Sequence, residues 1–278
     1  MTNGAEEMTD KTRPAFGDPF TSHVGYTSTR TGERTASSWI DMRPDLLDGR
    51  GRLHPGVLAF LVDSTAGVVC GTAALPSWVV TADLQFEVVD LPAVGPARAD
   101  AVVRRPGRRQ SCGEVTVHDE GDNDRIVAVG TVNHIVVAND QPLGEVPTDM
   151  AVGERLGPAL PPHPAPVPPL VELLHVERMR DGSVELPIVG VAVNPLGFLH
   201  GGLSCLANSL RGVPTVVVAD TAYSECDGFD PFQQISMVRY IQLGENFAIG
   251  NYPLTLQGVV QFDSVYPNTN VYGLTLIG

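Results

Sequence analysis

Residues 194–202 read NPLGFLHGG, and residues 49–63 read GRGRLHPGVLAFLVD. Each stretch holds a leucine followed by a histidine, with a glycine two residues after the histidine at Gly202 or Gly56. Each histidine leads into an apolar run. Only the run after His54 carries an acid, Asp63, which lies nine residues after that histidine. The two stretches therefore read as diverged copies of one motif.

The segments around the two stretches share one order of elements. In the first half, extended residues precede His54, and the run from Pro55 to about Ala73 is small and apolar all round, which predicts a buried helix with proline in its first turn. Strand-like runs follow at residues 78–89, 97–107, 108–119 and 125–137. The second half repeats this order more raggedly, with a helix expected over residues 201–212. The sequence therefore predicts an α+β fold with internal duplication.

A proline-rich segment separates the two halves. Residues 138–170 show no sustained period of two or 3.6, and their last third is mostly proline, so we expect an extended linker that joins neither sheet nor helix. The expected organisation is an acidic flexible tail at 1–21, an N-terminal domain at 22–137, this linker, and a C-terminal domain at 171–278.

The composition argues against two classes of partner. A formal net charge of −14 and a pI near 4.8 would repel nucleic acid and anionic membranes. We expect no apolar run that approaches the roughly 20 residues of a membrane-spanning helix, and the N-terminal residues lack a basic-then-apolar leader. The expectation is a soluble, cytoplasmic protein without nucleic-acid or membrane partners.

The four cysteines give no sign of a metal site or a disulfide. Cys70, Cys112, Cys205 and Cys226 are scattered, without C-x-x-C spacing and without paired histidines nearby. Metal sites and disulfide frameworks depend on such spacings or on an oxidising compartment. We therefore expect ordinary buried thiols and no bound metal.

The two motif copies carry a family resemblance. The pattern Asn-x-x-Gly-x-x-His-Gly-Gly at residues 194–202, followed by a helix, with an acid nine residues after the histidine as at Asp63, resembles the hotdog-fold acyl-CoA thioesterases of the phenylacetic-acid-pathway type. The resemblance covers about 22–137 and 171–278. It implies two tandem hotdog domains, each a long central helix wrapped by a curved antiparallel β-sheet.

The same resemblance implies the ligands, whereas the expected assembly comes from pairing between chains. The substrate would be an acyl-CoA, with coenzyme A bound only as part of the substrate, and neither a separate cofactor nor a metal would be needed. Sheet or helix faces would pair two chains, so we expect a homodimer.

The two copies have complementary losses against the family pattern. The second copy keeps the amide, the histidine and the glycines, namely Asn194, Gly197, His200, Gly201 and Gly202. It has Ser209 where the acid belongs, whereas the first copy has Asp63 but replaces the amide by Asp48 and the first glycine by Pro55. Because a helix rises about 1.5 Å per residue, Asp63 lies about 10 Å from the start of its own helix. Asp63 is therefore expected to meet the start of another helix, and the resemblance implies that the other copy supplies it, because paired hotdogs share these groups across their interface.

The second copy would supply the groups that polarise the thioester. Unpaired N–H groups and the dipole at a helix start stabilise the oxyanion that forms during attack. Gly201 and Gly202 let the acyl group approach this backbone closely. Asn194 would add an amide donor, and His200 would either fix the turn or touch the thioester.

The first copy would supply the acid. Asp63 would act as general base for water or, alternatively, as a nucleophile that forms an anhydride. Thr81 follows it by eighteen residues, where related enzymes place a hydroxyl that orients the water. The opposite site, around His54 and Ser209, lacks an acid and is expected to be silent, with a structural role for His54.

One basic cluster stands out in this acidic chain. Arg104, Arg105, Arg108 and Arg109 flank a Pro-Gly turn in RRPGRRQ. Guanidinium groups pair with phosphates bidentately, so the cluster is a candidate for the phosphates of coenzyme A. A solvated hairpin tip is the alternative interpretation.

The sequence bears on three other functions. A serine esterase is excluded because the chain has no G-x-S-x-G motif. A hotdog hydratase needs a positioned Asp–His pair, for which Asp18 and His23 are the sequence candidates, although no helical pattern follows His23. A non-catalytic acyl-CoA binding or regulatory protein is the remaining alternative, since half of the motif positions have changed.

Overall fold

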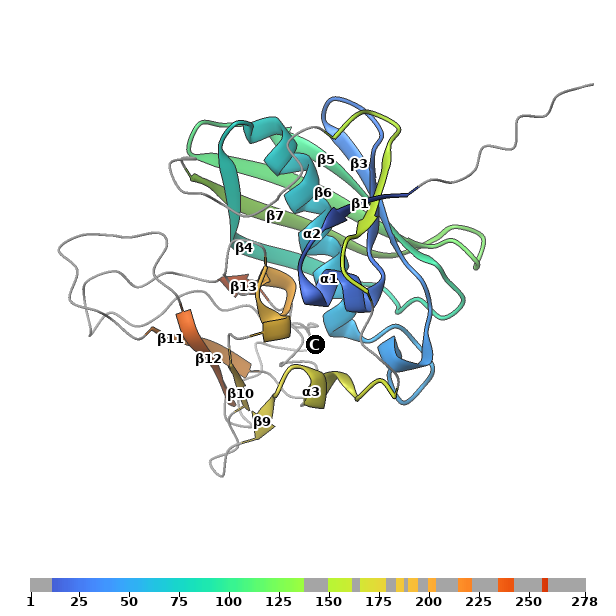
Figure 1. Ribbon diagram of the computed structural model, residues 1–278, viewed down its shortest axis with the longest axis vertical. Coiled ribbons are helices and arrows are strands. Elements are labelled where there is room, and N and C mark those ends of the chain that lie inside the picture. Colours follow the sequence, from blue (N-terminus) through green and yellow to red (C-terminus); the bar gives the residue numbers. More distant parts are fainter. Residues whose placement is uncertain are drawn as a thin grey trace, which may run out of the picture.

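The computed structural model describes residues 12–137, 150–161, 166–178, 184–187, 190–194, 200–203, 215–221, 235–242 and 257–259. Its centre is one long helix, α2 (Pro55–Ala74), which lies against a curved, mainly antiparallel sheet (Figure 1). The first half therefore has the mixed α+β architecture with a long helix and a wrapped sheet that the sequence predicts.

The bounds of α2 agree with the predicted apolar run. Pro55 occupies the first turn, and the Nδ1 atom of His54 accepts a hydrogen bond from Gly56 N–H at 3.1 Å, which caps the helix. The helix is apolar on every side because the sheet, α1 (Pro19–Val24) and residues of the second half surround it.

The length of α2 contradicts one expectation from the sequence. With 20 residues and a mean hydropathy of 1.7, this helix is long and apolar enough to cross a membrane by those two measures alone. Most of its side chains are buried inside the fold, from Gly56 through Gly71. The helix therefore serves as a core helix here. Buried core helices can be as long and as apolar as membrane-spanning helices.

Nine described strands form the larger sheet. In spatial order they are β1 (Arg13–Phe16), β8 (Arg155–Pro158), β2 (Thr27–Arg30), β3 (Thr35–Ile40), β5 (Ala97–Arg105), β6 (Gln110–Asp119), β7 (Arg125–Val137), β4 (Trp78–Val88) and β13 (Gln257–Val259). All neighbours are antiparallel except β1 and β8. Buried and less buried residues alternate along β5, as expected for a strand with one face on the core.

Small residues bring α2 close to the sheet. A Cβ atom added at Gly113 would lie 3.2 Å from Ala66 Cβ and 3.3 Å from Cys70 Sγ. A Cβ added at Gly130 would lie 2.8 Å from Phe86 Cβ. This close packing fixes the position of every side chain that α2 directs toward the sheet.

Two segments contain regular structure where the sequence led us to expect none. The segment expected to be only a linker contributes β8 and α3 (Leu170–Leu173), because β8 satisfies the backbone of β1 and β2 and buries Leu156 completely. Residues 12–21, expected in a flexible tail, contribute β1 and the start of α1, where Phe20 is fully buried. Short elements of this kind leave little periodic signal in a sequence.

The second half is described in part. Four strands form a separate antiparallel sheet: β11 (Thr215–Thr221), β12 (Ile235–Gln242), β10 (Val184–Pro187) and β9 (Glu177–Arg178). The last described strand, β13, instead extends the larger sheet beside β4. Of the helix expected over 201–212, only 201–203 are described. The tandem arrangement thus stays a prediction, and Cys205, Ser209 and Cys226 lie outside the described residues.

Candidate active site

The carboxylate of Asp63 is buried in the middle of α2 and is held by both halves of the chain. The side chain is 5% exposed. Its Oδ1 accepts a hydrogen bond from Thr81 Oγ1 at 2.8 Å, and its Oδ2 accepts one from the backbone N–H of Gly202 at 3.0 Å. A buried carboxylate needs such partners to offset its lost hydration. Thr81 comes from β4, whereas Gly202 lies 139 residues away in the sequence.

The two glycines after His200 lie directly against α2. Residues 201–203 are helical. A Cβ atom at Gly202 would lie 2.5 Å from Phe60 Cα and 2.6 Å from Ala59 O, while one at Gly201 would lie 2.9 Å from Thr81 Cβ and 3.0 Å from Asp63 Oδ2. No larger residue fits at either position without displacement. The sequence suggested glycine for access of a ligand, and the structure adds the close approach of α2.

His200 pairs with an acid that sequence reasoning had assigned elsewhere. Its Nε2 lies 2.9 Å from Asp18 Oδ1, and both side chains are buried. Asp18 also caps α1, since its Oδ1 accepts a hydrogen bond from Thr21 N–H at 2.8 Å. An aspartate directly before Pro19 is a recognisable helix start, so α1 was detectable. Its pairing across 182 residues was not.

The charge state of Asp18 follows from this pairing. Burial alone would raise its pKa, but the charge of His200 and hydrogen bonds from His200 and Thr21 outweigh burial and lower the pKa below its usual value. Asp18 is therefore a carboxylate at neutral pH. A carboxylate only accepts hydrogen bonds, so Nε2 of His200 carries the hydrogen between them.

Asn194 belongs to the same second-half segment as His200. It follows η2 (Gly190–Ala192), is partly buried, and has Gly197 among the undescribed residues after it. The backbone N–H of His200 donates to Ala192 O at 3.2 Å. The structure thus places Asn194 near the histidine in the chain, while its proposed contact with the substrate stays a prediction.

His54 sits apart from the Asp63 carboxylate and caps its own helix. Burial lowers the pKa of His54, and the charge of Asp48 opposes that effect. A neutral ring with Nδ1 free to accept from Gly56 N–H is consistent with the cap. His54 therefore has a structural contact, whereas its expected counterpart Ser209 lies outside the described residues.

Sequence reasoning missed a buried histidine close to Asp63. His134 on β7 is 1% exposed and lies in register between Thr81 on β4 and Ser111 on β6. Burial lowers its pKa to about 4, and the charge of Asp63 opposes this only in part. Its Nδ1 has no hydrogen-bond partner within the described part of the chain. The sequence predicted a strand over residues 125–137, but neither the burial of His134 nor its neighbours.

The low pKa of His134 predicts a stability change with pH. The unfolded state, with a histidine pKa of 6.5, binds more protons than the folded state between about pH 4 and 6.5, so stability is full above 6.5 and is lost as the pH falls. We expect the free energy of unfolding to fall by roughly 2 kcal/mol more in the wild type than in His134→Gln between pH 7 and pH 5. Urea unfolding at both pH values measures this difference. Equal losses in the two proteins would contradict it.

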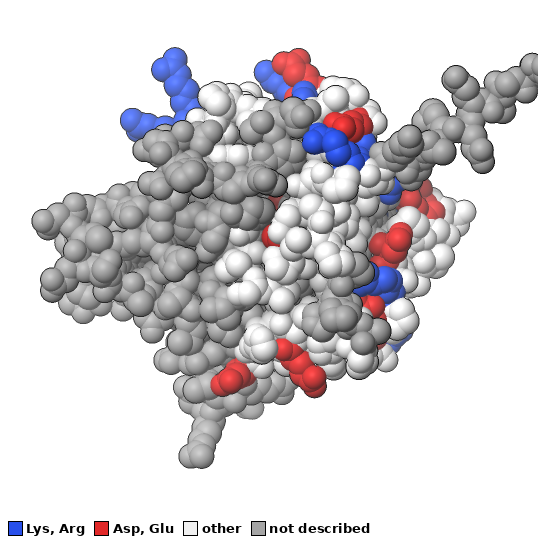
Figure 2. Space-filling view, viewed as in Figure 1, with Lys and Arg blue, Asp and Glu red and all other residues white. Residues whose placement is uncertain are grey.

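The arginine cluster lies at the hairpin between β5 and β6. Arg104 is engaged by Glu114 through Nε–Oε2 and Nη2–Oε1 contacts of 3.0 and 2.8 Å, while Arg105, Arg108 and Arg109 are exposed. Arg108 borders a hollow of about 480 Å³ beside the end of α2. Figure 2 shows basic side chains projecting from this edge of the described surface.

Among the residues that the structure describes, no group of three or more His, Cys, Asp or Glu side chains is placed to hold a metal ion.

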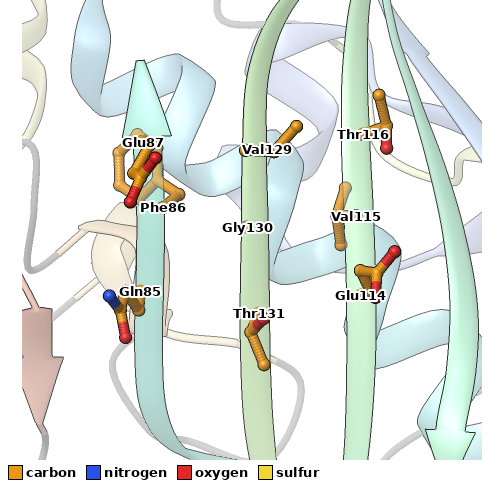
Figure 3. Close-up of a pocket in the computed structure, with 9 residues that line it drawn as sticks. All are labelled: Gln85, Phe86, Glu87, Glu114, Val115, Thr116, Val129, Gly130 and Thr131. Atoms are coloured by element: carbon orange, nitrogen blue, oxygen red, sulfur yellow. The ribbon is translucent and has the colours of Figure 1, made fainter. Parts of the chain in front are cut away.

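A second hollow lies on the opposite side of the sheet from α2. It has a volume of about 420 Å³ and is lined by β4, β6 and β7 (Figure 3). Glu87 and Glu114 border it, whereas Phe86 and Val115 point inward. Neither hollow includes Asp63. The acidic border disfavours a phosphate ligand in the second hollow.

Similarity to known proteins covers just under half of the chain. A family model described as the acyl-CoA thioesterase C-terminal domain matches residues 3–136. A Mycobacterium tuberculosis protein named as an esterase, Rv1847, is 31% identical over 118 residues, which are 41% of this chain and 83% of that protein. The family-model match includes Asp63 and Thr81 but ends before the second histidine motif.

Solved structures with similarity cover a comparable share. The structure of the Mycobacterium tuberculosis protein has 29% identity and a TM-score of 0.41, and covers 44% of this chain and 99% of that one. Thioesterase HI1161 from Haemophilus influenzae has 17% identity and a TM-score of 0.41, covering 44% and 84%. PaaI from the E. coli phenylacetic acid degradation operon has 17% identity and a TM-score of 0.35, covering 37% and 73%. The match to the family model and the similarity to the Mycobacterium protein show that this chain belongs to the hotdog-fold acyl-CoA thioesterase family.

Proposed function

We propose that the protein hydrolyses an acyl-CoA thioester, with Asp63 activating the water and with the carbonyl polarised at the helix start near Gly201 and Gly202. One observation carries the proposal. The buried carboxylate of Asp63 is bonded to Thr81 from the first half and to Gly202 N–H from the second. Asp63 is an acid in an apolar helix and is buried against the start of another helix. This placement favours a functional role for Asp63 over a purely structural one.

The proposed reaction is a direct attack by water. Asp63 takes a proton from the water while the water oxygen bonds to the thioester carbonyl carbon. The dipole of the helix start near Gly201 and Gly202 stabilises the negative oxygen of the tetrahedral intermediate, while Gly202 N–H holds Asp63 in place. The carbon–sulfur bond then breaks, and the leaving thiolate of coenzyme A takes up the proton from Asp63. Attack by Asp63 itself, through an anhydride, is the alternative first step.

The remaining second-half residues orient the thioester. Asn194 donates its side-chain amide to the substrate, and His200 fixes the turn before Gly201. Two observations support a fixed His200: its bond to Asp18, and its ring centroid lying 5.0 Å from that of Phe60 in an edge-to-face arrangement.

Thr81 holds Asp63 and the water in the proposed site. We expect Thr81→Val, which keeps the shape but removes the hydroxyl, to lower kcat about 10-fold with a small change in KM, because one hydrogen bond to a charged group is lost. Thr81→Ser keeps the hydroxyl and is expected to retain most of the activity. Steady-state kinetics of both variants measure this contrast. Equal activity in Thr81→Val and wild type would rule out a role for the hydroxyl.

The arginine cluster is proposed to contact the phosphates of coenzyme A. Arg105 pairs in register with Cys112 on β6, three strands from Thr81, which corresponds to roughly 14 Å. An extended pantetheine arm can span that distance. Since Arg104 is already engaged by Glu114, the proposal rests mainly on Arg105, Arg108 and Arg109.

Charge removal tests this contact. We expect the combined change of Arg105, Arg108 and Arg109 to Gln to raise KM for acyl-CoA about 10-fold, with kcat little changed, because phosphate contacts bind ground state and transition state alike. A short acyl thioester without the nucleotide should show no such change. Arg34→Gln, at another exposed position, is the matched control. An unchanged KM for acyl-CoA would favour the solvated hairpin tip.

The first experiment is thiol release from a panel of short, long and aromatic acyl-CoAs. Hydrolysis of any member above the uncatalysed rate supports the proposal, and the profile defines the acyl group. If no acyl-CoA is hydrolysed while one binds, the chain is an acyl-CoA binding or regulatory protein. The panel result therefore separates the two classes of function.

A hydratase is the second candidate, and the Asp18–His200 pair favours it. A hotdog hydratase needs a positioned aspartate and histidine, and these two lie 2.9 Å apart. In the structure Asp18 and His200 bond each other. In our preferred mechanism Asp63 therefore activates the water. An enoyl-CoA in the same panel, followed by the loss of its conjugated absorbance, distinguishes hydration from thiol release.

We further propose a homodimer in the cytoplasm, formed through sheet or helix faces. The acidic composition and the resemblance to paired hotdogs support these statements. Sedimentation of the full chain measures the assembly.

A further inference from the structure

Asp18 and His200 form a buried polar pair between the N-terminal segment and the second-half motif. Asp18 is 4% exposed and His200 is 9% exposed. The pair joins the start of α1 to the residue directly before Gly201, and Gly202 in turn donates to Asp63. Two acids of the first half thus hold two residues of the second half, His200 and Gly202, which lie on either side of Gly201.

The surroundings of the pair are aromatic. The ring of His200 packs edge-to-face against Phe60 at 5.0 Å between centroids and lies 6.4 Å from Phe20. Phe20 and Phe60 are fully buried. In such surroundings an aspartate and a histidine depend on each other, because removal of one leaves the other without compensation for its lost hydration.

The pairing also fixes the chemistry of the imidazole. Nε2 donates to Asp18, so the ring cannot rotate without breaking that bond. No residue within the described ranges forms a hydrogen bond with Nδ1 of His200.

We propose that Asp18 is a positioning residue of the thioesterase site, acting through His200. Asp18 fixes the protonated nitrogen and the orientation of the imidazole, and it thereby holds the helix start at Gly201 and Gly202 against Asp63. This inference rests on the proposed hydrolysis for its effect on catalysis. The pairing itself is tested independently of activity.

Two substitutions separate this role from the capping of α1. Asp18→Ser keeps a good N-cap for Thr21 but is too short to reach His200. Asp18→Asn keeps both the length and an acceptor oxygen but removes the charge. We expect kcat to fall about 10- to 100-fold in Asp18→Ser and less in Asp18→Asn, with KM little changed, as expected for loss of a hydrogen bond to a carboxylate. Wild-type kcat in Asp18→Ser would overturn the proposal.

A double-mutant cycle shows whether Asp18 acts through His200. In a His200→Ala background, Asp18→Ser is expected to cause no further loss of kcat. An equal loss in both backgrounds would mean that Asp18 acts by another route, and would overturn the proposal. Asp45→Asn is the matched control, since Asp45 lies 3.4 Å from Nε2 of His23 and not at the site.

A spectroscopic measurement is independent of turnover. In ¹⁵N spectra of the imidazoles in the full chain, we expect His200 to show a protonated Nε2 in the wild type and in Asp45→Asn, and a changed pattern in Asp18→Ser. An unchanged pattern in Asp18→Ser refutes the pairing. If the pairing is present but no acyl-CoA is hydrolysed, the proposed function fails while the Asp18–His200 contact stands.

Discussion

Asp63→Asn is expected to lower kcat for acyl-CoA hydrolysis at least about 100-fold, in the range for loss of a general base. The amide has nearly the shape of the carboxylate, so it can keep the bond to Thr81, but it cannot take a proton from water. It also places an NH₂ group or a neutral oxygen against Gly202 N–H, where the carboxylate now accepts at 3.0 Å. KM should change much less than kcat, because the lost interaction belongs to the transition state.

The measurement is thiol release under saturating substrate, with thermal unfolding of each protein beside it. Asp41→Asn, at an exposed position, is the matched control and should behave as wild type. If Asp63→Asn and wild type have the same kcat, another group is the base. Trapping of an acyl-enzyme in the wild type, with none in the variant, would favour Asp63 as the nucleophile.

Gly202→Ala is expected to have the second largest effect, with kcat about 100-fold lower and stability lower by about 2 kcal/mol. The added methyl would lie 2.5 Å from Phe60 Cα and 2.6 Å from Ala59 O. These are backbone atoms of α2, which cannot move aside as a flexible side chain would. The helix start must shift instead, and the bond from Gly202 N–H to Asp63 lengthens or breaks.

Gly49→Ala is the control for Gly202→Ala, because a Cβ at Gly49 meets nothing within 4 Å. Steady-state kinetics and thermal unfolding of the two variants give the comparison. Wild-type kcat and stability in Gly202→Ala would show that the two backbones are farther apart than the structure places them.

The sequence predicts the features that repeat along the chain. The all-round apolar run gives α2 nearly to the residue, and the alternation of side chains gives β4 to β7. Helix geometry together with the family resemblance predicts that Asp63 meets the helix start of the other copy, and the structure brings Asp63, Thr81, Gly201 and Gly202 together. The catalytic roles of these residues stay predictions.

Short elements and long-range pairs leave no such pattern. β8 has four residues in a proline-rich segment, and its strand character comes from the free edge of β2 rather than from its own sequence. Asp18 and His200 each belong to a recognisable local pattern, but only the fold makes them partners. His134 reads as one more inward strand residue until its register with Thr81 is known.

The contact of Gly202 with Asp63 couples ligand binding to the association of the two halves. A thioester that contacts both the first-half acid and the second-half helix start binds only while the halves are docked. By thermodynamic linkage, substrate therefore stabilises the docked state by an amount that grows with its concentration over its Kd. A mutation far from the chemistry that loosens this docking would then weaken substrate binding, even though it changes no group that touches the substrate.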